Sequence, residues 1–282
     1  MWVKLRRSVF LFVLFYAILV IGIMFGICTD RLLLYPSNKT ISTVGLTQRL
    51  LRLGDSVLEV WVRRSPSTKT KGAKVFVLEF VGNADRAEDG GRVLDEYWGT
   101  LAVETWIVNY PGFGGSRGKA QLKAIPSAAL LAYDELAKVA LNNPILIVGT
   151  SLGSTAALHV AANRNVAALV LQNPPPLQDL ILRRHGWWNL WLLALPISMH
   201  VPDELNSLVN ARKVKAPAVF VMAKKDMLVP FSYQLRVWES YAGSKEALEL
   251  PNATHNSLLS SSEKDNLKKM LLGLTKKIGV EF

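Results

Sequence analysis

The chain has 282 residues, of which 50% are apolar and 20% are charged, and this balance excludes an intrinsically disordered protein. Its single cysteine, Cys28, excludes an intrachain disulfide framework and any metal site built from clustered cysteines. The formal net charge of +11 and the positive mean hydropathy are together unusual for a soluble enzyme. The excess of apolar residues and the excess of positive charge must therefore each be located in the chain.

The apolar excess begins near the N-terminus. Residues Val9–Cys28 form an uncharged run that, as a helix, would be about 30 Å long and would span a bilayer. A cleaved signal peptide is the alternative, but its apolar core is shorter and ends at a small-x-small site, which this run lacks. We therefore expect an uncleaved transmembrane anchor at 9–28, preceded by a short tail at 1–8.

Flanking charges predict the orientation of this anchor. Lys4, Arg6 and Arg7 precede it, whereas Asp30 and Arg31 after it cancel. By the positive-inside rule the tail lies in the cytoplasm and the rest of the chain on the non-cytoplasmic side, which we interpret as a bacterial periplasm. The remaining positive charge favours contact with anionic lipid headgroups, so we interpret it as a membrane-surface feature and expect no nucleic-acid partner.

Residues 29–282 show no linker or repeat and are interpreted as one α/β domain. In the second half of Leu46–Arg64, the apolar residues Leu58, Val60 and Val62 stand at every second position. This pattern predicts a hairpin around Gly54 and Asp55. Runs that are apolar throughout predict strands buried on both faces at Val75–Phe80, Val103–Asn109, Ile145–Gly149, Ala167–Leu171 and Ala218–Met222. Helices are predicted at Asp85–Trp98, Ala129–Ala140, Leu152–Ala162, Ser232–Tyr241 and Ser261–Lys277. This alternation predicts a doubly wound, mostly parallel sheet.

The strongest chemical motif is Gly149-Thr150-Ser151-Leu152-Gly153, which fits G-x-S-x-G between a buried strand and a helix. In this setting the tight turn presents the serine hydroxyl above the sheet as a nucleophile. The alternative is a serine that only caps the following helix.

A serine nucleophile needs a base and a group that orients it. His255 lies on a polar loop between a short β run and the last helix, whereas the other histidines lie within or near helical and Trp-rich segments (His159, His185 and His200). Asp226 follows the strand at Ala218–Met222, at the rim where open α/β sheets bind ligands. The predicted catalytic residues are therefore Ser151, Asp226 and His255, in the chain order of an α/β-hydrolase.

An acyl-transfer site also needs donors for the oxyanion. The backbone N–H of Leu152 follows the nucleophile, and the N–H of Asn83 lies in the loop after the strand at Val75–Phe80. Asp85 is expected to cap the next helix. The alternative for Gly82-Asn83 is an ordinary turn.

Several motifs together resemble the α/β-hydrolase superfamily, in particular its membrane-anchored serine hydrolases with an N-terminal anchor. They are the segments 30–37, 81–84, 109–118, 149–153, 224–230 and 254–256, so the resemblance covers about residues 30–280. Two positions depart from the family pattern. Val81 stands where a histidine usually precedes the oxyanion-loop glycine, and Ala223 replaces the glycine of the acid loop.

Trp187, Trp188 and Trp191 lie where the resembled family carries lid insertions, around 177–205. We expect them to bind substrate as a short cap over an acyl pocket or at the bilayer interface, where Trp is enriched. Ordinary core packing is the alternative. The Gly-rich loop at 112–118 lacks the spacing of a nucleotide motif, and no histidine–carboxylate spacing indicates a metal, so no cofactor is expected.

These features predict a membrane-anchored serine hydrolase that cleaves a carboxylic ester or thioester, such as one derived from a lipid, through an acyl-enzyme. A peptidase or amidase using the same three residues is one alternative. A non-catalytic, membrane-tethered binding protein on a hydrolase scaffold is the other, and Val81 gives it some support.

Overall fold

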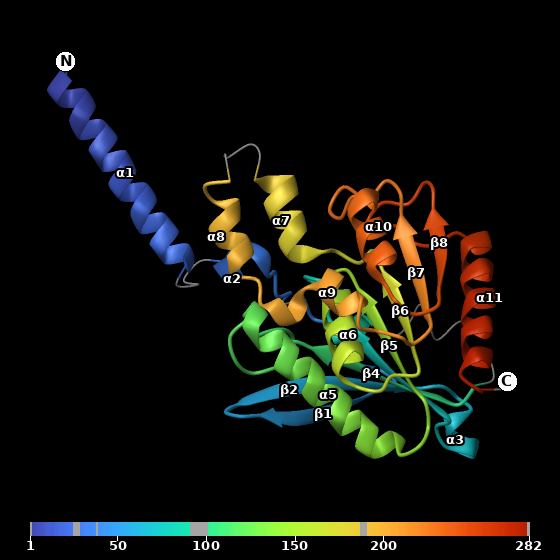
Figure 1. Ribbon diagram of the computed structural model, residues 1–282. Coiled ribbons are helices and arrows are strands. Elements are labelled where there is room, and N and C mark those ends of the chain that lie inside the picture. The colour runs from blue at the N-terminus through green and yellow to red at the C-terminus, as the bar shows by residue number, and fades with distance from the viewer. Residues whose placement is uncertain (1, 25–28, 38, 91–100, 187–190, 281–282) are drawn as a thin grey trace.

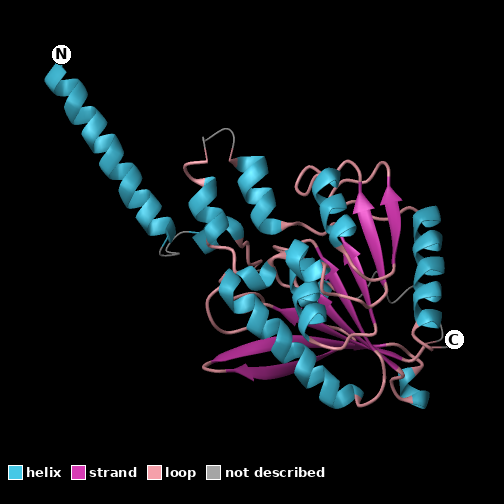
Figure 2. Ribbon diagram, viewed as in Figure 1, coloured by secondary structure: helices cyan, strands magenta, loops and turns pink. Residues whose placement is uncertain are grey.

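The computed structural model of the protein describes residues 2–24, 29–37, 39–90, 101–186 and 191–280. Among these residues lies a sheet of eight strands in the order β1-β2-β4-β3-β5-β6-β7-β8 (Figures 1 and 2). The strands are β1 (Leu46–Leu53), β2 (Ser56–Arg64), β3 (Val75–Phe80), β4 (Val103–Asn109), β5 (Ile145–Thr150), β6 (Ala168–Gln172), β7 (Ala218–Ala223) and β8 (Lys245–Leu250). Strand β2 is antiparallel to both of its neighbours, and the pairs from β4 to β8 are parallel. The prediction of a doubly wound, mostly parallel sheet is confirmed.

The helices among these residues lie between and around the strands (Figure 1). They are α1 (Trp2–Met24), α2 (Thr29–Leu33), α3 (Thr68–Lys71), α5 (Ile125–Ala140), α6 (Leu152–Asn163), α7 (Leu177–His185), α8 (Ala194–Met199), α9 (Ser207–Ala211), α10 (Phe231–Ser240) and α11 (Ser261–Lys277).

The predicted hairpin is formed by β1 and β2, with Leu53 paired to Ser56 across the turn. Gly54 has a φ of 57°, a left-handed conformation that glycine adopts without steric cost. Leu58, Val60 and Val62 point into the core, as the alternation in the sequence predicts.

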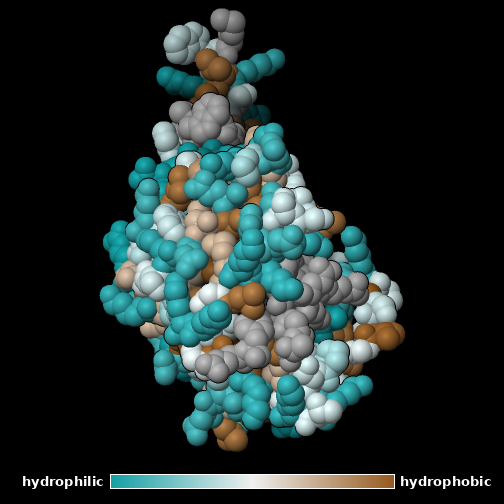
Figure 3. Space-filling model, turned by 90° about the vertical axis from the view of Figure 1, so that its right-hand side faces the viewer, coloured by the Kyte–Doolittle hydropathy of each residue, from teal (hydrophilic) through white to brown (hydrophobic). Residues whose placement is uncertain are grey.

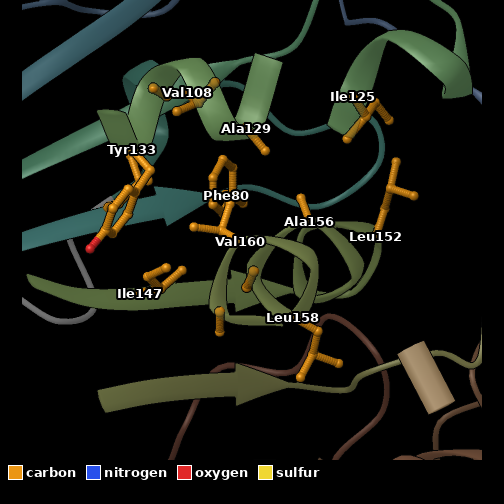
Figure 4. Packing of buried hydrophobic residues seen from close by; sticks show 14 of the residues in the cluster. Phe80, Val108, Ile125, Ala129, Tyr133, Ile147, Leu152, Ala156, Leu158 and Val160 are labelled. Atoms are coloured by element: carbon orange, nitrogen blue, oxygen red, sulfur yellow. The ribbon is translucent and has the colours of Figure 1, made fainter. Parts of the chain in front are cut away.

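Two hydrophobic clusters cover the two faces of the sheet. On one face, Phe80 of β3 and Ile147 of β5 pack against Ala129 of α5 and against Ala156 and Val160 of α6 (Figure 4). Each fully buried side chain of the size of Val, Leu or Phe contributes about 1.5–3 kcal/mol to folding. These contacts fix the position of α6, whose first residue follows Ser151.

On the other face, Leu267 and Leu271 of α11 pack against a cluster that includes Val219 and Val221 of β7. Helix α11 starts with a capping box, in which the Ser260 and Glu263 side chains satisfy each other's backbone N–H groups. Figure 3 views the molecule from the α11 side, where hydrophilic side chains predominate.

One expected helix is only partly tested. Within Asp85–Trp98 the structure describes a short 3₁₀ turn at Ala87–Asp89, capped by Arg86, while residues 91–98 lie outside the described part of the chain. The expectation that Asp85 caps a helix is therefore wrong for the turn that is described.

Helix α1 is long and apolar enough to cross a membrane, and none of its apolar window is buried in the protein. A signal sequence would have the same properties. The helix lies beside α8, and the Tyr16 hydroxyl donates a hydrogen bond to the carbonyl oxygen of Leu192, with 2.7 Å between the oxygens (Figure 1).

Candidate active site

Ser151 lies in a strained turn between β5 and α6. Its φ of 50° and ψ of −119° are outside the usual regions for a residue with a side chain, as expected of a nucleophile elbow. The two flanking glycines allow this turn. A Cβ on Gly149 would lie 2.6 Å from the Ser154 Cα, and a Cβ on Gly153 would lie 2.0 Å from the carbonyl oxygen of Phe80.

The structure brings together the three residues that the sequence predicts as catalytic. His255 Nε2 lies 3.0 Å from Ser151 Oγ, and His255 Nδ1 lies 2.6 Å from Asp226 Oδ2. All three follow the carboxyl ends of parallel strands, namely β5, β7 and β8, which end at the same edge of the sheet. The arrangement can remove the proton of Ser151 through His255 and stabilise the resulting imidazolium by Asp226.

The Asp226 carboxylate is buried and saturated with hydrogen bonds. Its Oδ1 accepts from the backbone N–H groups of Leu228 and Val229, each at 2.8 Å. Its Oδ2 accepts from Gln234 Nε2 of α10 at 3.3 Å in addition to facing His255. These donors hold the carboxylate in one orientation, and Gln234 is a residue that the sequence analysis missed.

Asn173 is a second residue that the sequence analysis missed. It follows β6, is buried, and has a φ of 46°. Its Nδ2 donates to the carbonyl oxygen of His255 at 3.1 Å, and its Oδ1 accepts from the N–H of Ala223 at 3.0 Å. A polar residue directly after a buried strand at this rim was the available signal.

The loop after β3 lies directly against the nucleophile elbow. The buried Tyr110 hydroxyl donates to the carbonyl oxygen of Val81 at 2.9 Å, and the Gly153 Cα faces the carbonyls of Phe80 and Val81. Within the described residues, neither the N–H of Asn83 nor that of Leu152 donates a hydrogen bond. The loop that carries Asn83 therefore packs against the turn that carries Leu152. These two residues are the predicted oxyanion donors.

Asp85 belongs to this loop and does not act as the expected helix cap. Its N–H donates to the carbonyl oxygen of Gly82 at 3.3 Å, and its carboxylate accepts a hydrogen bond from the backbone of Gly82. Desolvation of the carboxyl raises the pKa of Asp85, although the residue is exposed overall, and the nearby His255 opposes this shift. The carboxylate therefore turns back to its own loop and bonds the Gly82 backbone.

Of the three tryptophans predicted to bind substrate, Trp187 and Trp188 lie outside the described residues. Trp191 lies between α7 and α8, packs against Gly186, and donates from Nε1 to the carbonyl oxygen of Leu182 at 3.1 Å. Among the described residues, Trp191 forms no hydrogen bond with Ser151, Asp226 or His255.

Helix α7 is fixed to the loop that carries Asp226. Arg184 donates to the carbonyl oxygen of Met227 at 2.6 Å, and Asp179 pairs with both Arg183 and Arg236 of α10. Helix α7 thus lies beside the loop that carries Asp226.

One described hollow lies elsewhere. Its volume is about 410 Å³, and Gln48, Leu50, Arg52, Val57, Gly115 and Arg117 line it, beside the β1–β2 hairpin. Among the residues that the structure describes, no group of three or more His, Cys, Asp or Glu side chains is arranged to hold a metal ion.

A parallel sheet with a serine elbow, an acid and a histidine at its carboxyl edge defines the α/β-hydrolase class, and comparison with known proteins agrees. The chain has the α/β-hydrolase fold. No family model matches the sequence.

Two curated relatives are similar in sequence. The α/β-hydrolase domain-containing protein aho-3 of Caenorhabditis elegans is 27% identical over 161 residues, which cover 56% of this chain and 45% of the relative. An uncharacterised protein of Mycobacterium tuberculosis is 26% identical over 159 residues, which cover 55% of this chain and 54% of the relative. The matched region spans about half the length of each relative.

Solved structures are similar in fold at low sequence identity. Est1E from Butyrivibrio proteoclasticus matches 81% of this chain and 99% of its own, with a TM-score of 0.67 and 15% identity. An esterase of Pyrococcus furiosus matches 87% of this chain and 97% of its own, with a TM-score of 0.65 and 16% identity. These likenesses establish the α/β-hydrolase fold.

Proposed function

We propose that the protein is a serine hydrolase that cleaves a carboxylic ester or thioester. The observation that carries this proposal is the position of His255, which lies within hydrogen-bond distance of both Ser151 Oγ and the buried Asp226 carboxylate. One of the structures similar in fold is an esterase, that of Pyrococcus furiosus, and this supports an ester substrate.

In the proposed reaction, His255 Nε2 takes the hydroxyl proton of Ser151 as Oγ attacks the acyl carbonyl. The N–H groups of Leu152 and Asn83 stabilise the negative oxygen of the tetrahedral intermediate. The imidazolium then protonates the leaving alcohol or thiol, which departs from the acyl-enzyme. Finally, His255 activates a water that releases the carboxylic acid and restores the serine.

We further propose that residues 9–28 anchor a hydrolase domain at 29–282 to the membrane, with that domain on the non-cytoplasmic side. The apolar helix α1 supports this proposal, together with the apolar side chains exposed beside it on the cap. Those side chains are Trp191, Leu192, Leu195 and Met199. An acyl ester from the bilayer would reach the proposed site along this side of the protein.

Labelling by a fluorophosphonate probe tests the proposal. The detergent-solubilised full chain should be labelled and should hydrolyse p-nitrophenyl esters, and Ser151→Ala should lose both properties. Ser127→Ala, on the exposed surface of α5, serves as the matched control and should behave as wild type. Equal labelling of wild type and Ser151→Ala would contradict the enzyme and favour a binding protein. Faster turnover of amides than of esters would instead favour the peptidase or amidase.

A further inference from the structure

The segment that follows α1 in sequence returns to the loop proposed to hold the oxyanion. Asn83 Nδ2 donates to the carbonyl oxygen of Leu33 at 2.7 Å, and Asn83 Oδ1 accepts from the N–H of Tyr35 at 3.0 Å. Both ends of one side-chain amide are therefore used to hold a backbone segment about 50 residues away in sequence. The Asn83 amide thus pairs with this backbone as a neighbouring β-strand would, through one donor and one acceptor.

This segment is itself fixed to the protein. Thr29, Asp30 and Leu34 are buried. Asp30 Oδ1 accepts from the N–H of Leu122 at 2.9 Å and lies 3.4 Å from His200 Nε2, at the end of α8. The backbone that Asn83 contacts is therefore a fixed support.

A second contact joins the same two regions. Arg86, three residues after Asn83, donates from Nη1 to the carbonyl oxygens of Ser37 and Lys39 at 3.2 and 3.0 Å. The loop from Gly82 to Arg86 is thus attached to the segment 33–39 at two separate places.

The start of the loop is held from outside by Tyr110 and by residues 33–35. Val81 has an isopropyl group at the position where the resembled family carries histidine, so it offers no side-chain hydrogen bond. Tyr110 holds the carbonyl of Val81 from one side, and the Asn83 amide provides the next described attachment along the loop. The N–H of Asn83 is a proposed oxyanion donor, and such a donor must be placed closely on the developing charge.

We propose that residues 33–35 act as a strap for the oxyanion loop and that the Asn83 side chain is the positioning residue that joins the two. This inference rests on the proposed function. It implies that the segment after the membrane helix is part of the catalytic apparatus, because it sets the position of a backbone N–H that contacts the transition state.

The test uses the detergent-solubilised full chain and p-nitrophenyl butyrate. Asn83→Ala keeps the backbone N–H but loses both bonds to the strap. We expect kcat to fall about tenfold to a hundredfold while KM changes less than twofold, since a displaced donor acts on the transition state. The pH dependence of kcat/KM should keep its shape, because His255 and Asp226 are untouched.

Asn143→Ala is the matched control. Asn143 donates one side-chain hydrogen bond to the carbonyl oxygen of Ala140 at the end of α5, so the same substitution removes a comparable local bond. Its kcat should stay within twofold of wild type. Thermal melting of both variants separates a loss of folded protein from a loss of kcat in the folded state.

Tyr35→Pro provides the reciprocal test, because it removes the N–H that donates to Asn83 without changing Asn83. If both changes act through the same contact, the double variant should have the kcat of Asn83→Ala alone. A kcat of Asn83→Ala within twofold of wild type would overturn the strap, and so would multiplicative effects in the double variant. Failure of wild type to react with the fluorophosphonate probe would instead overturn the proposed function, so the two failures are distinguishable.

Discussion

The amide of Asn173 donates a hydrogen bond to the backbone carbonyl of His255 at 3.1 Å, and it thereby joins the loop after β6 to the loop after β8. The same side chain accepts from the N–H of Ala223, at the end of β7. One buried residue therefore sets the relative positions of the strand end that leads to the acid and the loop that carries the base.

Replacing Asn173 should reduce turnover more than folding. Asn173→Gly keeps a residue that tolerates the positive φ but removes both hydrogen bonds of the amide. We expect kcat on p-nitrophenyl butyrate to fall about tenfold or more, because small displacements of a catalytic group are costly. Asn173→Ala should lose the same bonds and add backbone strain, and hence have a lower melting temperature than Asn173→Gly. Wild-type kcat in Asn173→Gly would contradict this role.

Gly153 and Gly273 form a matched pair of helical glycines. A Cβ on Gly153 would lie 2.0 Å from the carbonyl oxygen of Phe80, whereas a Cβ on Gly273 of α11 meets nothing within 4 Å. Gly153→Ala should destabilise the protein by about 3 kcal/mol through overpacking and should abolish labelling of Ser151. Gly273→Ala should stabilise it by about 0.5–1 kcal/mol through helix propensity. Thermal melting would check both, and similar melting temperatures for the two variants would refute the steric argument.

Tyr110→Phe should weaken both stability and turnover. The buried hydroxyl donates to the carbonyl of Val81, and burial raises the pKa of Tyr110, so this donor stays protonated at working pH. Its removal leaves a buried carbonyl unpaired, at a cost of about 1–3 kcal/mol. Tyr241→Phe loses a similar bond to the carbonyl of Ala216 and should lower the melting temperature without a loss of kcat. Equal kcat losses would show that the effect is not specific to the oxyanion loop.

We predict that the buried His159 makes the protein less stable in weak acid. Burial within α6 lowers the pKa of His159 below the ordinary value of 6.5. As the pH falls through 6.5, His159 becomes protonated in the unfolded chain. In the folded chain it stays neutral until the pH reaches its lower pKa, so protonation favours unfolding in this window. The free energy of unfolding attributable to this group then falls by up to about 1.4 kcal/mol per pH unit in that window. His159→Gln should lose less stability than wild type between pH 7 and pH 5 in thermal melts, and parallel losses would contradict the assignment.

Trp191→Ala tests the cap. Because Trp191 packs on Gly186 and bonds to Leu182, its loss should loosen the link between α7 and α8. If this segment covers an acyl pocket, kcat/KM on octanoyl or longer p-nitrophenyl esters should fall about tenfold, since each lost apolar contact with a methylene is worth roughly 0.8 kcal/mol. Activity on the acetyl ester serves as the internal control. Equal losses on short and long esters would contradict a cap that binds the acyl chain.

The sequence by itself determined the strands, the five longest of the described helices and the three residues predicted as catalytic. Strands β3 to β7 are short, mostly apolar runs bounded by polar loops, and both faces of each are largely buried, so their composition predicts them. Ser151 is identified by its flanking glycines, which the steep turn requires. These features depend on residues that are neighbours in sequence.

The tertiary structure decided how the site is held in place. Asn173, Gln234 and Tyr110 support the proposed catalytic groups, and the partners of these side chains are set by the folded chain rather than by a local sequence pattern. Asp85 was misassigned because a capping signal cannot show that its carboxylate will turn back to Gly82. The attachment of Asn83 to the segment after α1 likewise exists only once the sheet brings residues about 50 positions apart into contact. Sequence periodicity encodes which atoms are buried, whereas the folded chain decides which polar atoms meet.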